Sequence, residues 1–174
     1  SGAEKYFQKE FAYDKTPMLL PFEKLLTRKA YVLEIGGGGG RDATWMTKRG
    51  HRVLAIDNSE AMLARMKQTP QVEAQLMDMR DIAWEDTFDA VMSVASLMHI
   101  TKAEAKTTLQ KINAALKPRG VFFVTVPRGE GEGYDEKRRY FANYQPDELI
   151  ALCAQTGFEL VEHLEDFTPS LSSV

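Results

Sequence analysis

Cysteine is nearly absent from this 174-residue chain, in which Cys153 stands alone. A single cysteine excludes an intrachain disulfide and a metal site built from several thiolates, and it fits a reducing compartment such as the cytoplasm. Long apolar runs are missing as well, because none approaches the roughly 20 residues that cross a bilayer. The pattern of a secretory signal, a basic leader followed by an apolar run, is not seen either. We therefore expect a cytoplasmic protein that does not enter a membrane.

An excess of positive charge is also lacking. Lys and Arg number 22 against 25 Asp and Glu, so the formal net charge is -3. A nucleic acid or an anionic membrane is bound through a basic surface that neutralises phosphates, so we expect neither as the main partner. A small-molecule substrate fits this balance, whereas the oligomeric state stays open. The hydrophobic share of 44% and the charged share of 27% are ordinary for one globular domain.

Internal repeats are absent, and short apolar runs instead alternate with amphipathic windows. This alternation predicts a doubly wound α/β domain with a mostly parallel, Rossmann-like sheet and helices on both faces. We expect this domain to span residues 30–174, after an N-terminal helical cap segment at residues 1–29. In such sheets ligands bind beyond the carboxyl ends of the strands. The expected strands are residues 31–35, 53–56, 72–77, 88–93, 121–126 and 158–163, and the expected helices are residues 42–49, 60–68, 102–116 and 146–156.

Five consecutive glycines, residues 36–40, join the first expected strand to a helix. Such a loop permits a tight turn and lets a ligand lie against bare backbone. A flexible linker is the alternative, although linkers seldom separate a strand from a helix. Residues 38–43 also satisfy the dinucleotide pattern G-x-G-x-x-G/A, but a glycine run satisfies many patterns. Glu34, two residues before Gly36, would be poorly placed beside a pyrophosphate and could accept hydrogen bonds from a cationic or hydroxylated group.

The spacing Glu34-x-Gly36-x-Gly38-x-Gly40 resembles the first motif of the class I S-adenosylmethionine-dependent methyltransferases. The resemblance implies that these residues surround the methionyl part of S-adenosyl-L-methionine and that S-adenosyl-L-homocysteine is the product. Arg41 and the aspartate after it resemble a subgroup that includes tellurite-resistance-type and other small-molecule methyltransferases. Arg41 would then approach the methionyl carboxylate, for which a guanidinium is well suited. A solvated arginine in a first helical turn is the alternative.

An acid, Asp57, ends the second expected strand. An acid at this position can accept hydrogen bonds from the two hydroxyls of a ribose. Helix capping is the alternative role, but Ser59 is already well placed as the N-cap of the next helix. Asn58 and Met62 resemble the family's flanking positions, and the resemblance implies that Met62 packs beside adenine.

Asp78 follows the third expected strand, and Val94 follows the fourth. The resemblance implies that Asp78 accepts a hydrogen bond from the adenine amino group and that Met79 covers an adenine face with its thioether. A turn aspartate is the alternative, and Asp81 could share that duty. Val94 resembles a position whose backbone faces the cofactor.

The segment Ser96-Leu97-Met98-His99 is similar to an S-L-x-H pattern of the same family. The resemblance implies that His99 lies near the transferable methyl group, where an imidazole can orient a nucleophile or remove its proton. A hydrogen-bonded structural histidine is equally compatible, because an already ionised acceptor needs no base. The segment 116–123 resembles the family's L-K-P-G-G turn into the fifth strand, so the resemblance covers about residues 31–161.

Two segments are candidates to cover the cofactor: residues 6–13 and residues 128–140. The second is glycine-rich, charged and aromatic, which is typical of a mobile loop over an active site, although an ordinary surface loop has the same composition. The family ends with a sixth strand and an antiparallel seventh. Residues 158–167 can form the sixth, but residues 168–174 contain Pro169, which suits no central strand. We therefore expect an incomplete antiparallel edge.

These features predict an in-line displacement that moves a methyl group from a sulfonium to a small-molecule acceptor, with no metal. Most of the catalysis would come from the alignment of the two reactants. A nicotinamide-dependent oxidoreductase is a second reading, against which Glu34 and Asp78 count. A module that binds S-adenosylmethionine without catalysis is a third.

Overall fold

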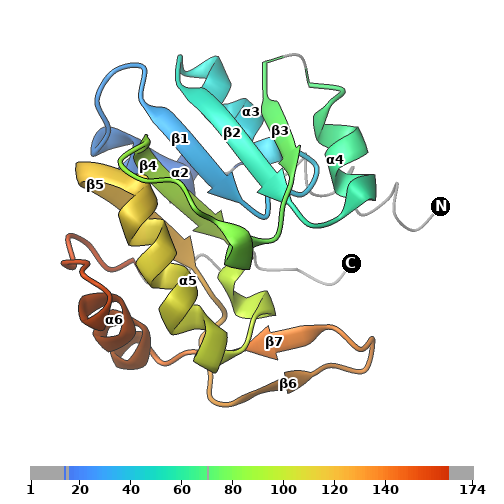
Figure 1. Ribbon diagram of the computed structural model, residues 1–174, viewed down its shortest axis with the longest axis vertical. Coiled ribbons are helices and arrows are strands. Elements are labelled where there is room, and N and C mark those ends of the chain that lie inside the picture. Colours follow the sequence, from blue (N-terminus) through green and yellow to red (C-terminus); the bar gives the residue numbers. More distant parts are fainter. Residues whose placement is uncertain (1–13, 15, 70, 165–174) are drawn as a thin grey trace.

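The computed structural model describes residue 14, residues 16–69 and residues 71–164. Five parallel strands form one sheet in the order β3-β2-β1-β4-β5, as predicted for a doubly wound α/β domain (Figure 1). The strands are β1 (Tyr31–Ile35), β2 (Arg52–Asp57), β3 (Glu73–Leu76), β4 (Phe88–Val94) and β5 (Leu116–Thr125). The helices are α2 (Thr16–Lys24), α3 (Arg41–Lys48), α4 (Glu60–Met66), α5 (Lys102–Ala115) and α6 (Pro146–Gln155), with 3-10 turns η1 (Met79–Asp81) and η2 (Leu97–His99). No helix among these is long and apolar enough to cross a membrane.

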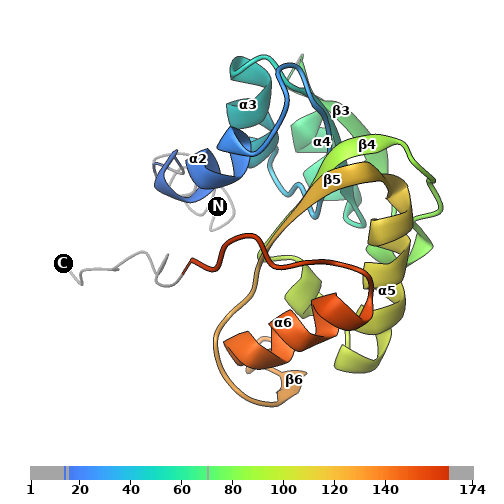
Figure 2. The ribbon, with the colours of Figure 1, turned by 90° about the vertical axis from the view of Figure 1, so that its left-hand side faces the viewer.

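Two hydrophobic cores lie on the two faces of the sheet, because successive strand residues point to opposite sides. Val32 packs with α2, α3 and α4 on one face, and its neighbour Leu33 packs with α5 on the other. Figure 2 shows α2 and α3 on one side of the sheet and α5 and α6 on the other. This double cover explains why the strands read as continuous apolar runs.

Local signals define the helix ends. Thr101 and Glu104 form a reciprocal capping box at the start of α5. Pro146 occupies the first turn of α6, and Gly157 follows that helix with a φ of 94°. Each predicted helix is therefore present, with ends that differ by one or two residues.

The segment expected as a turn before β5 is a bulge within that strand. Phe88 pairs with Leu116, but Ala90 pairs with Val121, so the residues between are extra on the β5 side. Asp89 accepts hydrogen bonds from the Tyr31 amide at 2.7 Å and from Lys117 at 2.9 Å. Asp89 thereby holds the starts of three neighbouring strands together.

The prediction of a sixth strand at residues 158–163 is wrong. These residues have no regular structure, and the ring of Phe158 packs on Phe122 of β5 with centroids 5.1 Å apart. The apolar pattern therefore serves side-chain packing over β5 rather than backbone pairing beside it. Within the described residues no antiparallel strand joins the five-stranded sheet. Residues 168–174, where the sequence predicts an incomplete antiparallel edge, and the candidate covering segment at residues 6–13 lie outside the described part of the chain.

A small hairpin replaces the loop expected at residues 128–140. Strands β6 (Glu132–Tyr134) and β7 (Tyr140–Ala142) pair antiparallel beyond the carboxyl end of β5 (Figure 1). The turn between them is closed by Asp135, which accepts hydrogen bonds from Nε and Nη2 of Arg139 at 2.9 and 2.7 Å. The division of the chain at residue 30 stays a prediction, with α2 inside the expected N-terminal segment.

Candidate ligand-binding site

A cavity of about 650 Å³ opens at the carboxyl ends of β1 to β4. Its position is the switch point between β1 and β4, where the chain turns from one half of the sheet to the other. Every predicted site residue except Glu34 and Gly40 lines it. A larger groove of about 910 Å³ runs between β5, α2 and α6, and it contains none of the predicted residues. We place the functional site in the smaller cavity because the polar side chains of the strand tips converge there.

The glycine loop forms one wall of the cavity. Gly36 has a φ of 70°, and a Cβ there would lie 2.4 Å from Cβ of Ser96, so packing alone requires glycine. Gly38 has a φ of 53°, but a Cβ there would meet no protein atom within 4 Å. The backbone of Gly38 thus faces open space in the cavity, where a ligand can approach it closely.

Glu34 lies beneath this loop rather than in the cavity wall. Its side chain is buried against α3, where the backbone amide of Ala43 donates a hydrogen bond to it. Burial raises the pKa of the Glu34 carboxyl well above its usual range, and the negative charge of Asp42 raises it further. Its Oε2 atom has no hydrogen-bond partner among the described residues. A buried carboxylate oxygen without a partner is costly, so this position calls for an explanation beyond packing.

Arg41 enters the cavity from the first turn of α3. Its Nε atom donates to Asp42 at 2.7 Å, and its side chain is only 16% exposed. A freely solvated arginine, the alternative left open by the sequence, is therefore wrong. Gly40 has a φ of 80°. Its carbonyl accepts a hydrogen bond from the Thr44 amide, so Gly40 lies at the start of α3.

Asp57 ties the glycine loop to the start of α4. Its Oδ2 atom accepts the Gly38 amide at 3.0 Å, and its Oδ1 atom accepts the Ser59 amide at 2.9 Å. Ser59 is the N-cap of α4, as predicted, and accepts from the Met62 amide. Each carboxylate oxygen of Asp57 keeps a second lone pair for a ligand in the cavity.

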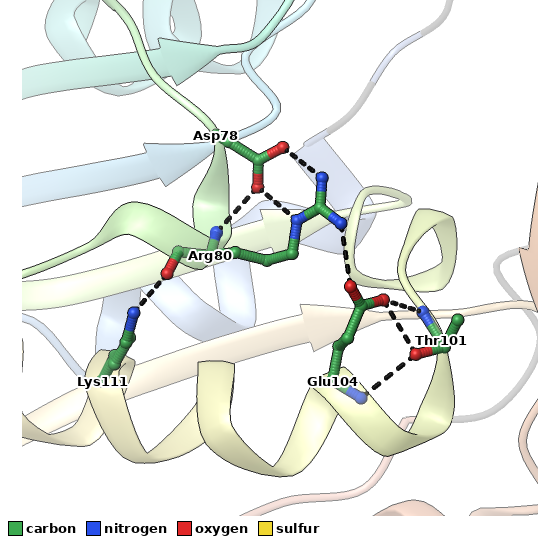
Figure 3. Close-up of polar contacts among 5 residues, drawn as sticks. All are labelled: Asp78, Arg80, Thr101, Glu104 and Lys111. Carbon is green, nitrogen blue, oxygen red and sulfur yellow. Dashed lines mark hydrogen bonds and ion pairs between the residues drawn. The ribbon is translucent and has the colours of Figure 1, made fainter.

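Asp78 is held by Arg80 at the far end of the cavity (Figure 3). Its Oδ1 atom accepts the amide and Nε of Arg80 at 2.8 and 2.9 Å, and its Oδ2 atom accepts Nη2 at 2.8 Å. The Arg80 guanidinium lowers the pKa of Asp78 to about 2, with a smaller contribution from Asn58. Asp78 also caps η1, so the turn-aspartate role is present, and Asp81 does not share it.

Arg80 extends this contact to the next layer of the fold. Its Nη1 atom donates to Glu104 of α5 at 2.8 Å, and Glu104 in turn accepts the amide of Thr101 at 2.9 Å (Figure 3). Lys111 donates to the Arg80 carbonyl. A chain of charge-assisted hydrogen bonds therefore runs from the cavity to the segment that follows His99. Arg80 was not predicted from the sequence, because its second partner, Glu104, lies 24 positions away in the chain.

His99 lies in η2 and is exposed toward the cavity. Its Nδ1 atom is 2.8 Å from the carbonyl oxygen of Tyr140, and its ring meets Phe141 edge-on with centroids 5.0 Å apart. Phe141 and Arg139 line the same cavity. Arg139 belongs to the segment that the sequence marks as a candidate cover for the cofactor, whereas Phe141 was missed, because only the fold brings it next to η2.

The turn from β4 into η2 contains two residues of the cavity lining, Ala95 and Ser96. Ser96 is buried and donates to the Ile35 carbonyl at 2.6 Å, which joins β4 to β1 at the switch point. Ala95 has a φ of 52°, a conformation that is unfavourable for alanine and is held by hydrogen bonds from its amide to Thr125. Non-glycine residues in this conformation gather at functional sites.

Comparisons with known proteins agree on one kind of protein. A model of the family described as "Methyltransferase domain" matches residues 32–120, just over half of the chain. An uncharacterized methyltransferase of Staphylococcus carnosus is 25% identical over 83% of this chain and 70% of its own. A trans-aconitate 2-methyltransferase of Delftia acidovorans is 29% identical over 68% of this chain.

One similar solved structure is also a methyltransferase. The 1,6-didemethyltoxoflavin N1-methyltransferase of Burkholderia thailandensis, with 1,6-didemethyltoxoflavin and S-adenosylhomocysteine bound, has a TM-score of 0.77 and 25% identity. The match covers 92% of this chain and 73% of that one. This chain spans less of the Delftia protein, 46% of its length. The relatives are thus longer than the segment that they share with this chain.

Proposed function

Because this chain belongs to the methyltransferase-domain family, among the class I S-adenosylmethionine-dependent enzymes, we propose that it methylates a small-molecule acceptor. The observation that carries the proposal is the convergence of the open backbone at Gly38 with Asp57 and Asp78 in one cavity. The subgroup with tellurite-resistance-type enzymes, suggested by Arg41 and Asp42, belongs to the same proposal. S-adenosyl-L-homocysteine would be the second product.

The residues present fit such a cofactor. Gly36 and Gly38 would border the methionyl part, and Arg41 would pair with its carboxylate. The free lone pairs of Asp57 would accept the ribose hydroxyls. Glu34 is buried beneath the glycine loop and does not line the cavity, so it would support the cofactor indirectly, through that loop.

The remaining predicted residues would hold the adenine. Met62 and Met79 line the cavity with soft thioethers that can pack on both faces of a flat ring. Asp78 would accept from the amino group, Asn58 would flank it, and the Val94 backbone would close the opposite side. When bound, S-adenosyl-L-methionine supplies an electrophilic methyl group on a sulfonium sulfur. The chain supplies alignment, and His99 is proposed to orient the acceptor or take its proton.

A small-molecule acceptor is supported by two of the similar proteins, whose names state one. One is named for trans-aconitate and the other for 1,6-didemethyltoxoflavin. The cavity, at about 650 Å³, falls within the range of roughly 300–1,000 Å³ that is usual for small-molecule pockets.

Calorimetry with S-adenosyl-L-methionine and S-adenosyl-L-homocysteine tests the proposal directly, with a nicotinamide dinucleotide as the competing ligand. We expect binding of both sulfur compounds and none of the dinucleotide. An acceptor panel, read by release of S-adenosyl-L-homocysteine, then tests catalysis. Binding without turnover of any acceptor would favour a non-catalytic module, and binding of the dinucleotide alone would reverse the proposal.

A further inference from the structure

The acceptor side of the cavity is built by two segments that are distant in the chain. Met98 and His99 come from η2, and Arg139 and Phe141 come from the β6–β7 hairpin. Residues 128–144 lie outside the part that the family model matches, which ends at residue 120. The hairpin is therefore a feature that can differ among relatives that share the cofactor-binding half.

The contact between His99 and the hairpin determines where the imidazole carries its proton. The partner of Nδ1, 2.8 Å away, is the carbonyl oxygen of Tyr140, which can only accept a hydrogen bond. In the neutral ring Nδ1 therefore carries the hydrogen and Nε2 carries the lone pair. The edge-on ring of Phe141 limits rotation of the imidazole away from this orientation. His99 is thus preorganised to take a proton at Nε2.

We propose that the acceptor is a conjugated molecule whose methyl-accepting oxygen or nitrogen carries a dissociable proton, as in a phenol, and that Tyr140 and Phe141 position His99 to remove it. This inference rests on the methyltransferase function proposed above and adds the acceptor class. A carboxylate acceptor is ionised at neutral pH and has no proton for Nε2 to take.

The chemical step balances with the groups named. Nε2 takes the proton of the acceptor O–H or N–H, whose electron pair forms the bond to the methyl carbon. The bond from that carbon to sulfur breaks, its electrons stay on sulfur, and S-adenosyl-L-homocysteine leaves. The imidazolium still donates from Nδ1 to the Tyr140 carbonyl, and its exposure lets it return the proton to solvent.

The neighbouring side chains suit a flat, acidic acceptor. Phe141 and Met98 offer apolar surfaces on which a conjugated ring can pack. The Arg139 guanidinium lies 5.1 Å from the Phe141 ring and is held in place by Asp135. Its positive charge would favour the negative charge that develops on the acceptor as the proton leaves.

A series of substituted phenols of decreasing phenol pKa tests the role of His99. We compare the wild type with His99→Asn, whose amide can still donate to the Tyr140 carbonyl. We expect a loss of at least about 100-fold in kcat with weakly acidic phenols, the usual size of general-base catalysis. With nitrophenols already ionised at the assay pH the loss should fall below threefold, at unchanged affinity for S-adenosyl-L-homocysteine. An equal loss across the series would assign His99 a purely structural role and overturn the inference.

Nuclear magnetic resonance of histidine-labelled protein tests the positioning without any turnover. The signals of the three histidines, His51, His99 and His163, are assigned by single substitutions. We expect the Nδ1-protonated tautomer for neutral His99, and a shift toward a tautomer mixture in Phe141→Leu. Phe158→Leu, the same substitution at a ring that packs on Phe122 and does not line the cavity, is the matched control and should leave the tautomer unchanged.

The outcomes separate the inference from the function on which it rests. Nε2-protonated His99 in the wild type, or benzoate methylated faster than every phenol and N–H acceptor, overturns the inference while methyl transfer stands. Failure to bind S-adenosyl-L-homocysteine counts against the function itself. In that case the tautomer measurement still decides whether Nε2 is the free base.

Discussion

Asp57 and Asp78 stand at neighbouring strand tips, yet the protein uses their oxygens differently. Asp57 accepts one backbone amide on each oxygen, whereas both oxygens of Asp78 already accept from the Arg80 guanidinium. At the scale of the residue, Asp57 therefore has the greater free capacity for a ligand. Asp57 is therefore the first of the two acids to test by mutagenesis for ligand binding.

Asp57→Ala is expected to weaken binding of S-adenosyl-L-homocysteine by about 1–3 kcal/mol, because the ribose hydroxyls and the Gly38 amide would lose their acceptor. Isothermal titration calorimetry measures the change. Glu73→Ala, which removes an exposed acid paired with Arg52 on the edge strand, is the control and should bind as the wild type does. A wild-type dissociation constant in Asp57→Ala would remove Asp57 from the site.

Glu34→Gln is expected to raise the free energy of unfolding above pH 6. The folded protein raises the pKa of Glu34, so wild-type stability falls as pH rises from the unfolded-state pKa toward the folded-state one, and the neutral amide avoids that loss. The advantage should vanish at pH 4, where the carboxyl is protonated in both states. Urea unfolding of the wild type and Glu34→Gln at the two pH values measures this difference. Equal stability of the two proteins at both pH values would contradict the prediction and show that the Glu34 charge does not destabilise the fold.

At the scale of the element, the glycine loop combines two requirements that the sequence presents as one run. Gly36 is packed against Ser96, which belongs to the turn after β4, whereas Gly38 faces the cavity. The first glycine holds the fold together at the switch point, and the second leaves room for a ligand. The same substitution at the two positions should therefore have different consequences.

Gly36→Ala is expected to destabilise the protein, because its Cβ would lie 2.4 Å from Cβ of Ser96. Gly38→Ala should cost only about 1–2 kcal/mol of stability, the usual penalty for a left-handed alanine, but should reduce cofactor affinity more than tenfold. Thermal unfolding and calorimetry on both variants separate the effects. If the two variants lost similar cofactor affinity and had the same stability, the assignment of a packing role to Gly36 and a ligand-facing role to Gly38 would be wrong.

Helix and strand positions were largely predictable at this scale, since they follow from caps and apolar periodicity. Thr101 and Pro146 mark helix starts through local chemistry alone. The wrong prediction of a strand at residues 158–163 has a physical cause. An apolar run predicts burial, but it does not distinguish a strand that pairs through its backbone from a segment that packs through its side chains. Phe158 uses its ring on Phe122. The β6–β7 hairpin was missed because its closing contact, Arg139 with Asp135, is a side-chain pair.

At the scale of the whole molecule, Arg80 connects the sheet edge to the helix layer. It links Asp78 near the end of β3 to Glu104 at the start of α5, and its carbonyl accepts from Lys111 (Figure 3). The cavity wall and the His99 segment are thereby fastened to each other. The contact is a property of the packed layers rather than of any one element.

Arg80→Gln is expected to lower the free energy of unfolding at pH 7, with a loss that shrinks as pH falls. The pKa of Asp78 is lowered to about 2, so its stabilising contribution is present above the unfolded-state value of about 3.8 and disappears as pH drops toward 2. Urea unfolding at pH 7 and pH 3 of wild type and variant measures this dependence. Arg52→Gln, which breaks an exposed pair, is the control and should change stability by less than about 1 kcal/mol.

The sequence by itself determined the sheet, its helices and the acids at the strand tips, because apolar periodicity, capping residues and glycines act over short stretches of chain. Only the tertiary structure decided that Glu34 lies beneath the loop, that Arg80 holds Asp78, and that Tyr140 and Phe141 meet His99. Each of these is a contact between residues whose distance along the chain says nothing about their distance in space. The acids at the strand tips were therefore readable in the sequence, whereas their charge state and their partners depend on packing.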